Sequence, residues 1–444
     1  MKHTLPAGPR SWIPGANLRA MQRDPLAFLT SVARDYGDVS SFKFGPQAVY
    51  FFNHPELIRD VLVTKDRSFM KGRALQRTKI LLGEGLLTSE GELHRRQRRL
   101  MAPAFHRERV TRYAEVMIAN AVRTADAWRD GETIDVAHEM MRLTLSIVAQ
   151  ALFGADVSGE ADEIGTALTQ LLESFTLTLS PLSAWLERLP LPRVRAMKSA
   201  IARLDRTIYS MIHERRQSGA DRGDLLSMLL LAQDEESGGR MSDQQVRDEA
   251  MTLFLAGHET TANALSWTWY LLAQHPEVER RLHEEVDRMS RPPALDARLP
   301  FTHALLSESM RLYPPAWLIG RLALEDVTIG NVTVPRGAVA IVSQYVMHRD
   351  ARFWPDPERF DPSRFLSGAE RPKFAYFPFG GGSRTCIGEG FAWTEGVLVL
   401  ATIAQRWRLT LAQHELVRPQ PMITLRPRGG IRMHGVRRTA GTTS

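Results

Sequence analysis

The single cysteine of this 444-residue chain, Cys386, lies in the segment FGGGSRTCIG at residues 379–388, which leads into an apolar helical run. Free backbone N–H groups at a helix N-terminus stabilise a thiolate, and Arg384 adds positive charge two residues away. Consecutive glycines let the backbone lie close against a flat or bulky group. A thiolate held in this way can bind iron as an axial ligand, although an arbitrary lone cysteine is more often a small buried apolar residue.

A second polar site interrupts a long apolar helix. Apolar residues recur at helical spacing over residues 242–274, which predicts a helix of about 50 Å through the core. Within it, AGHETT at residues 256–261 places Gly257, which weakens a helix, near the acid Glu259 and the alcohol Thr260. The residues alone leave two interpretations open. One is a functional polar site, and the other is a glycine kink with a threonine hydroxyl bonded to a carbonyl one turn earlier.

A third pair of polar residues lies on a predicted helix that begins at Pro300 and ends before Pro314. Glu308 and Arg311 are three residues apart, so they share one face of this helix and can form an ion pair. Such pairs are common on solvated helices, and this pair by itself predicts no function.

Together these segments resemble the cytochrome P450 family. The spacing Phe379-x-x-Gly382-x-Arg384-x-Cys386-x-Gly388 is similar to its haem-binding signature, and AGHETT is similar to its oxygen-binding motif. The resemblance runs from about residue 24 to residue 438. It implies one haem-enclosing domain over residues 1–444, mainly α with small β-sheets, in which a long central helix lies over the haem and the cysteine loop lies beneath it.

The resemblance also implies roles for individual residues. Cys386 would be the axial ligand of the iron in haem b, and Glu259 with Thr260 would deliver protons to dioxygen bound in the space beside Ala256 and Gly257. Haem propionates need cationic or hydrogen-bonding partners. The residues expected to bind the cofactor are His94, Arg98, Ala256, Gly257, Arg321, Phe379, Arg384, Cys386 and Gly388. A structural triad of Glu308, Arg311 and Arg359 would lock the proline-rich segment beneath the haem.

By this resemblance the protein is a haem-thiolate monooxygenase that inserts one oxygen atom of O2 into an apolar organic substrate. Alternatives are a peroxide-dependent peroxygenase, an isomerase on the same fold, a haem-based sensor and a basic nucleic-acid binder. The acid–alcohol pair argues against the first two. Candidate pocket segments at residues 77–87, 175–185, 253–256, 315–319 and 422–425 are rich in apolar side chains and suit a fatty acid, a terpenoid or a polyketide.

The charge distribution bears on partners. The net charge is +7, and residues 66–110 hold eleven Lys or Arg against five Asp or Glu. Aromatic residues are not interleaved there, so we expect no nucleic-acid partner. No nucleotide-binding stretch is apparent, so we expect electrons from a separate acidic ferredoxin or flavodoxin, with its NAD(P)H-dependent reductase. This donor would dock near Arg95, Arg96 and Arg99.

Composition sets the remaining expectations. With 43% hydrophobic and 24% charged residues the chain is globular, and one cysteine excludes an intramolecular disulfide or a multi-cysteine metal site. No apolar stretch is long enough for a membrane anchor, and we expect a monomer in the cytoplasm.

The elements that must position these residues are mostly helical. Ser242 is the predicted N-cap of the long helix, and residues 388–406 predict another helix. A hairpin is expected over residues 42–52, and single strands are expected over residues 326–334 and 339–342. Residues 353–362 contain too many prolines for either regular element and predict an ordered meander with buried aromatic side chains.

Overall fold

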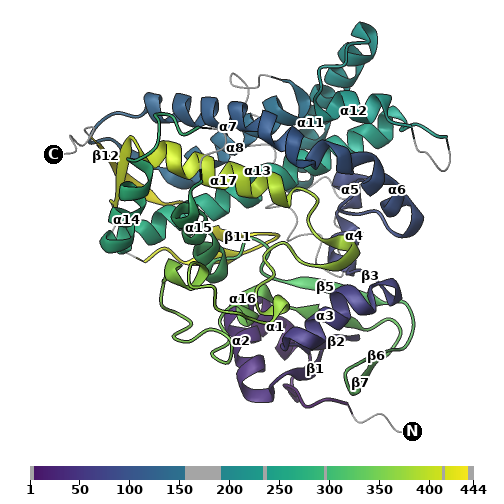
Figure 1. Ribbon diagram of the computed structural model, residues 1–444. Coiled ribbons are helices and arrows are strands. Elements are labelled where there is room, and N and C mark those ends of the chain that lie inside the picture. The colour runs from purple at the N-terminus through teal and green to yellow at the C-terminus, as the bar shows by residue number, and fades with distance from the viewer. Residues whose placement is uncertain (1–4, 156–191, 234–237, 295–297, 413–415, 439–444) are drawn as a thin grey trace. The chain divides into compact units, whose positions relative to one another are not determined.

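The computed structural model describes the chain except residues 1–4, 156–191, 234–237, 295–297, 413–415 and 439–444 (Figure 1). It divides into two compact units, each built from two stretches of sequence. We call Met1–Gln76 with Glu308–Cys386 the sheet unit, and Arg77–Ser307 with Ile387–Ser444 the helical unit. The expectation of one haem-enclosing domain stays a prediction.

A five-stranded sheet with the order β1-β2-β8-β5-β3 organises the sheet unit. The expected hairpin over residues 42–52 is confirmed by the antiparallel pair β1 and β2, and β2 pairs with β8 in parallel. The expected single strand over residues 326–334 is wrong, because the chain reverses at Gly330 and forms the hairpin of β6 and β7. The strands are β1 (Val39–Phe44), β2 (Gln47–Phe52), β3 (Phe69–Lys71), β5 (Ile319–Ala323), β6 (Val327–Ile329), β7 (Val332–Val334) and β8 (Val339–Val342).

Short helices and the meander complete the sheet unit. Within residues 353–361 the structure has no helix or strand, and Trp354 is fully buried with its Nε1 donating to Ala375 O at 3.1 Å, which confirms the ordered meander. The helices are α1 (Ala16–Arg23), α2 (Pro25–Tyr36), α3 (Pro55–Arg59) and α16 (Gln344–Met347). A π-helical turn occupies Asp60–Thr64, and short 3-10 turns occupy Asp66–Ser68, Pro362–Phe365, Lys373–Ala375 and Gly382–Arg384.

The long helix α13 (Asp243–Gln274) is the core of the helical unit. It begins as predicted, because the Ser242 side chain accepts from Gln245 N–H and the Gln245 side chain accepts from Ser242 N–H. Helix α8 (Val136–Phe153) packs along α13, and the rings of Phe153 and Phe254 stack at 4.4 Å. Because other elements surround α13, its side chains are buried on nearly every face from residue 251 to residue 272.

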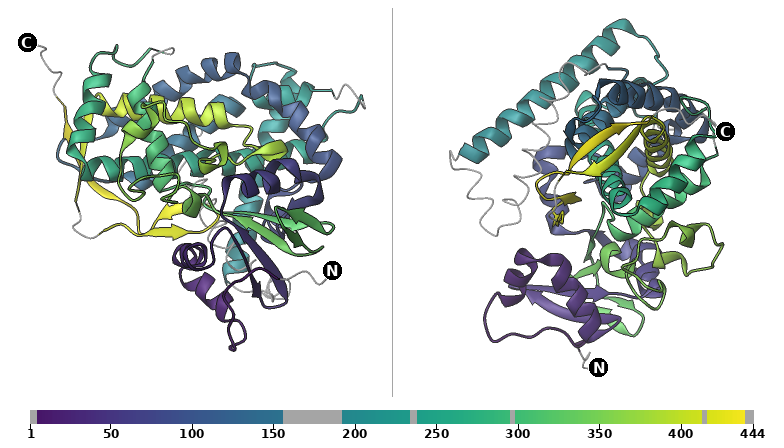
Figure 2. Two further views of the ribbon diagram at one scale, coloured as in Figure 1. Left: turned by 60° about the horizontal axis from the view of Figure 1, so that its bottom comes forward. Right: turned by 90° about the vertical axis from the view of Figure 1, so that its left-hand side faces the viewer.

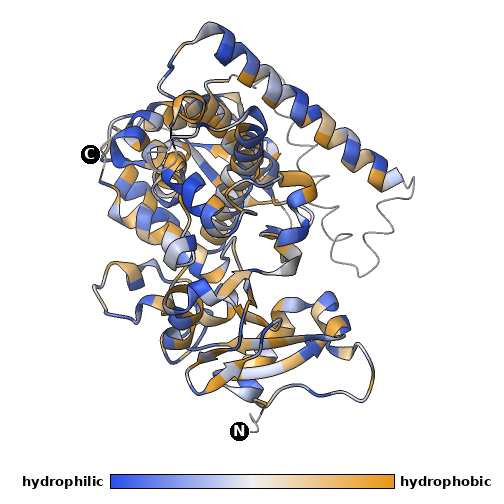
Figure 3. Ribbon diagram, turned by 90° about the vertical axis from the view of Figure 1, so that its right-hand side faces the viewer, coloured by the Kyte–Doolittle hydropathy of each residue, from blue (hydrophilic) through white to orange (hydrophobic). Residues whose placement is uncertain are grey.

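Further helices cover this core. Helix α11 shows alternating polar and apolar colour (Figure 3) because Ala200, Leu204, Ile208 and Ile212 recur every four residues as its buried stripe. The other helices are α5 (Lys79–Leu82), α6 (Gly91–Met101), α7 (Arg107–Ala127), α11 (Pro192–Ser218), α12 (Leu225–Leu231), α14 (Pro276–Val286) and α17 (Glu389–Ala404). Helices α4 (Arg73–Arg77) and α15 (Pro300–Leu312) cross the boundary between the units. The predicted helices at 300–313 and 388–406 are therefore confirmed as α15 and α17.

The helical unit contains two small sheets, and all their strands but one come from the C-terminal part of the chain, drawn in yellow in Figure 2. One contains β4 (Thr133–Asp135), β12 (Arg432–Arg437) and β9 (Trp407–Leu411), and the other contains β10 (Pro419–Pro421) and β11 (Leu425–Pro427). Strand β11 packs against α13. Among the helices that the structure describes, none is long and apolar enough to cross a membrane.

Candidate active site

The loop that carries Cys386 is held by its own backbone. Cys386 N–H donates to Phe379 O at 3.0 Å. Gly382 has a φ of +71°, and a Cβ at this position would lie 2.0 Å from Leu62 O, so this glycine is required by packing within the protein rather than by space for a ligand. Cys386 is exposed, and Gly388 is the N-cap of α17. The loop therefore presents an exposed thiol just ahead of a helix N-terminus.

A buried histidine, which the sequence reasoning missed, anchors the start of this loop. His348 Nε2 accepts from Phe377 N–H at 3.0 Å, and Phe377 O accepts from Gly380 N–H at 2.9 Å. Burial lowers the pKa of His348 well below its ordinary value, and the positive charges of Arg311 and Arg349 lower it further. The ring is therefore neutral, and one of its nitrogens can accept a hydrogen bond from the backbone.

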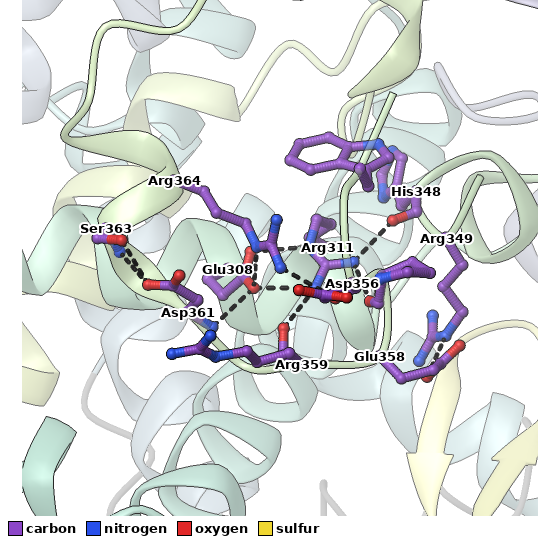
Figure 4. A network of polar contacts seen from close by, with 12 residues as sticks. Glu308, Arg311, His348, Arg349, Asp356, Glu358, Arg359, Asp361, Ser363 and Arg364 are labelled. Carbon is purple, nitrogen blue, oxygen red and sulfur yellow. Dashed lines mark hydrogen bonds and ion pairs between the residues drawn. The ribbon is translucent and has the colours of Figure 1, made fainter. Parts of the chain in front are cut away.

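Glu308 and Arg311 form a fully buried bidentate pair (Figure 4), with Nε to Oε2 at 2.7 Å and Nη2 to Oε1 at 2.9 Å. Arg311 also donates to the carbonyls of His348 at 2.8 Å, Pro357 at 2.6 Å and Arg359 at 3.1 Å. Every one of these partners lies in the sheet unit. The pair thus binds the meander and, through His348, reaches the cysteine loop.

The structure corrects the third member of the predicted triad. Arg364 Nε lies 3.3 Å from Glu308 Oε1, and Arg364 Nη2 donates to Asp356 O at 2.9 Å. Arg359 enters the network through its main-chain carbonyl instead (Figure 4). The chain contains Pro-x-Arg-Phe twice, at residues 357–360 and 362–365, and the sequence pattern did not distinguish them.

The AGHETT segment opens one face of α13. Ala256, Gly257 and Thr260 are partly exposed on a stretch of helix that is otherwise buried, and their spacing places them on one side. A Cβ at Gly257 would lie 2.9 Å from Val148 Cγ2, so this glycine also allows the close approach of α8. Thr260 Oγ1 donates to Ala256 O at 2.8 Å. This is the hydroxyl-to-carbonyl bond expected by the second interpretation of the sequence. The helix nevertheless continues without a break from Asp243 to Gln274.

Glu259 points away from that partly exposed face into the protein, where it is 1% exposed. Its Oε1 accepts from Arg426 Nε and from Thr424 Oγ1, each at 2.5 Å. Neither partner was identified from the sequence, because both come from a hairpin more than 160 residues away in the chain.

A second buried acid, Glu395 of α17, was also missed, although a charge within an apolar helix could have signalled it. Burial raises the pKa of Glu395 well above its ordinary value, and the nearby Thr261 side chain only partly offsets this. Neither carboxyl oxygen accepts a hydrogen bond from the residues that the structure describes. The carboxyl group is therefore held in its neutral form. Glu395 lies on α17, the helix that follows the cysteine loop. Its side chain lies near Thr261 of α13, the residue after Thr260.

This shift predicts a pH-dependent stability. A raised pKa in the folded state stabilises the protein fully below the ordinary pKa of about 4.5, and the contribution is lost as pH rises toward the raised value. Glu395→Gln is therefore expected to gain stability relative to wild type as pH increases from 5 to 8, by at most about 1.4 kcal/mol per pH unit. Chemical denaturation at several pH values checks this. Exposed Glu284, replaced by Gln, is the control and should show no such trend.

The cationic residues expected to bind the propionates lie in both units. His94 is buried and Arg98 half-buried, four residues apart on α6 of the helical unit. Arg321 on β5 and Arg384 beside Cys386 belong to the sheet unit, and both are half-buried.

Comparison with known proteins identifies the family. A sequence model described as Cytochrome P450 matches residues 6–432. Cyclooctatin synthase of Streptomyces melanosporofaciens is 43% identical, over 91% of this chain and 90% of the relative. Pentalenene oxygenase of Streptomyces avermitilis is 37% identical over 99% of both chains. The chain belongs to the cytochrome P450 family.

A third relative, cyclooctat-9-en-7-ol 5-monooxygenase of Streptomyces melanosporofaciens, is 39% identical over 91% of this chain and 88% of its own. This P450 is accordingly a haem-thiolate monooxygenase with haem b as its cofactor. Each unit, taken by itself, has residues that suit this group. The sheet unit has an exposed thiol two residues from a half-buried arginine, and the helical unit has a partly exposed stripe of small side chains on α13. When bound, haem supplies the oxygen-activating chemistry.

Proposed function

We propose that this P450 oxidises an apolar terpenoid by inserting one oxygen atom of O2, and that Cys386 would hold the haem iron through its thiolate. The observation that carries the ligand assignment is the exposed thiol of Cys386 at the end of a backbone-held loop, just before α17. His94, Arg98, Arg321 and Arg384 are the residues that we propose as partners of the haem propionates.

The protein's part in the reaction is to place the substrate and to deliver protons. Thr260 lies on the partly exposed face of α13, and its hydroxyl is already oriented by Ala256 O. Glu259, the next residue, is a buried acid that can carry protons from the protein interior to this face. Ala256 leaves space beside Thr260 for a small reactant.

Two observations support a terpenoid substrate. Two relatives are named for oxidising cyclooctat-9-en-7-ol and pentalenene, both terpenoids, and they align with about nine-tenths or more of this chain. Candidate pocket segments in the described chain, at residues 77–87, 253–256, 315–319 and 422–425, are mostly apolar. The candidate segment at residues 175–185 lies outside the described residues.

A binding and product panel tests the substrate class. Purified enzyme is titrated with pentalenene, cyclooctat-9-en-7-ol and a sixteen-carbon fatty acid, and the spin-state shift and products are recorded. We expect a terpenoid to bind at least about tenfold more tightly than the fatty acid, a difference of ~1.4 kcal/mol, and to yield a hydroxylated product. Tighter binding and oxidation of the fatty acid would contradict the assignment. An isomeric product formed without O2 uptake would indicate an isomerase, and turnover supported by peroxide but not by electron donors would indicate a peroxygenase.

For electrons we propose an acidic ferredoxin or flavodoxin that meets the monomeric enzyme in the cytoplasm, where NAD(P)H is available. It would dock on the basic helix α6, where Arg95 and Arg99 are exposed. Arg96, also expected in this surface, is half-buried and donates to Arg240 O at 3.4 Å. The predicted docking of the electron donor therefore depends on the exposed side chains of Arg95 and Arg99.

Charge reversal of Arg95 and Arg99 to Glu is expected to slow reduction by the donor about tenfold at low salt and to flatten its salt dependence. Stopped-flow reduction over a range of ionic strength measures both effects. Arg280→Glu, an exposed site on α14, is the matched control. Unchanged rates in the double variant would exclude α6 as the docking surface.

A further inference from the structure

Strand β11 is fixed to α13 by polar contacts that recur on three successive turns of the helix. Glu259 Oε1 accepts from Thr424 Oγ1 at 2.5 Å, and Asn263 Nδ2 donates to the same Thr424 oxygen at 3.0 Å. One turn further, Trp267 Nε1 donates to Leu425 O at 2.9 Å. Residues 259, 263 and 267 lie four apart and therefore form one row on the helix. These three residues of α13 fix the position of β11 relative to the carboxyl group of Glu259.

The same register brings a positive charge onto Glu259. Arg426 Nε lies 2.5 Å from Glu259 Oε1, with 12% of the arginine side chain and 1% of the glutamate side chain exposed. Because both side chains are largely shielded from water, the charge of Arg426 compensates the charge of Glu259. Removal of either residue leaves an uncompensated buried charge. The neighbouring His258 does not substitute for the arginine, because burial lowers the pKa of His258 and favours its neutral form.

The two oxygens of Glu259 are not equivalent. Thr424 and Arg426 both donate to Oε1, whereas Oε2 is buried and accepts no hydrogen bond from the residues that the structure describes. Two charge-assisted hydrogen bonds on one oxygen fix the rotamer of the side chain and occupy that oxygen. A proton can then be taken up only at Oε2.

We propose that Thr424 and Arg426 are positioning residues that hold Glu259 as a carboxylate in one orientation and leave Oε2 as its proton-exchanging atom. This inference rests on the proposed function, in which Glu259 is the acid of the proton relay. In each cycle a proton relayed through the protein interior binds Oε2 and leaves from the same atom toward Thr260, so that the carboxylate is restored.

Infrared spectroscopy of substrate-free protein at pH 7 tests the role of Arg426 without turnover. Arg426→Gln is expected to gain a carboxylic acid C=O band, because a buried carboxylate that has lost its counter-charge takes up a proton. The double variant R426Q/E259Q should lack this band, which assigns it to Glu259. An R426Q spectrum that matches the spectrum of R426Q/E259Q would overturn the proposal.

Coupling of electron use to product formation tests the positioning. In R426Q, product formed per NAD(P)H is expected to fall about tenfold with an unchanged KM, equivalent to ~1.4 kcal/mol in the productive step. Thr424→Val removes only the hydroxyl and should lower coupling severalfold. If R426Q does not fold, the coupling measured in T424V tests the proposal instead. Wild-type coupling in folded T424V would reject the proposal.

The matched control is Arg222→Gln, which breaks an exposed arginine–glutamate pair of the helical unit, Arg222 to Glu214 at 2.9 Å, so the freed carboxylate stays in water. It should alter neither the infrared band nor the coupling. The proposed function itself is tested by Glu259→Gln. Wild-type coupling in E259Q would refute the relay role of Glu259, whereas the R426Q band would still report whether Arg426 keeps this carboxyl group ionised.

Discussion

Replacement of Arg311 by leucine is expected to lower the free energy of unfolding by about 3–5 kcal/mol. The change leaves Glu308 charged and fully buried, and it removes the donor for three main-chain carbonyls, two of them in the meander. Because His348 joins this network to the cysteine loop, the variant should also retain less haem. Chemical denaturation followed by circular dichroism measures the stability, and the haem-to-protein absorbance ratio measures retention.

Two neighbouring arginines provide the controls. Arg364→Gln removes an ion pair to Glu308 and should cost about 1–2 kcal/mol. Arg359→Gln should change stability by less than about 0.5 kcal/mol, because only its main-chain carbonyl contacts Arg311. A cost at Arg359 equal to that at Arg311 would restore Arg359 to the triad and refute the role assigned to Arg364.

Replacement of Glu259 by glutamine is expected to reduce product formation by about 100-fold or more, the range in which general acid–base groups contribute. Electron consumption should continue, with peroxide released instead of product, because the amide accepts the hydrogen bonds of Thr424 and Arg426 but carries no proton to Thr260. Simultaneous measurement of NAD(P)H oxidation, peroxide and product separates this outcome from a general loss of activity.

Glu395→Gln is the comparison for this experiment. Since burial already raises the pKa of Glu395 and keeps it neutral, an amide is nearly isosteric with the native group, and turnover at pH 7 should stay within about twofold of wild type. Full product formation in E259Q together with a strong loss of product formation in E395Q would show that Glu395 of α17, and not Glu259 of α13, delivers protons.

Local sequence signals sufficed for the helices that carry the site. Ser242 and Gln245 provide a capping box, the apolar spacing persists for the length of α13, and the proline after His275 prevents its continuation. The AGHETT segment could be placed within α13 for the same reason. The loop of Cys386 was similarly accessible, because its glycines, its arginine and the helix that follows it are adjacent in the chain.

Contacts between distant segments could not be predicted in this way. The choice between Arg359 and Arg364 depends on the path of the meander, which no periodicity encodes. The partners of Glu259 lie on the hairpin of β10 and β11, which Asn263 and Trp267 of α13 hold through hydrogen bonds to Thr424 and Leu425. Even the role of Gly257 depends on a distant residue, because Val148 of α8 occupies the space where a side chain would be.

The absorption spectrum of the reduced, carbon-monoxide-bound protein tests most directly whether Cys386 is the axial thiolate. The proposal predicts a strongly red-shifted Soret band in the wild-type protein and loss of that band in Cys386→Ser that still binds haem. A folded, haem-loaded wild-type protein whose Soret band is not red-shifted, or a Cys386→Ser variant that keeps the wild-type band, would contradict it.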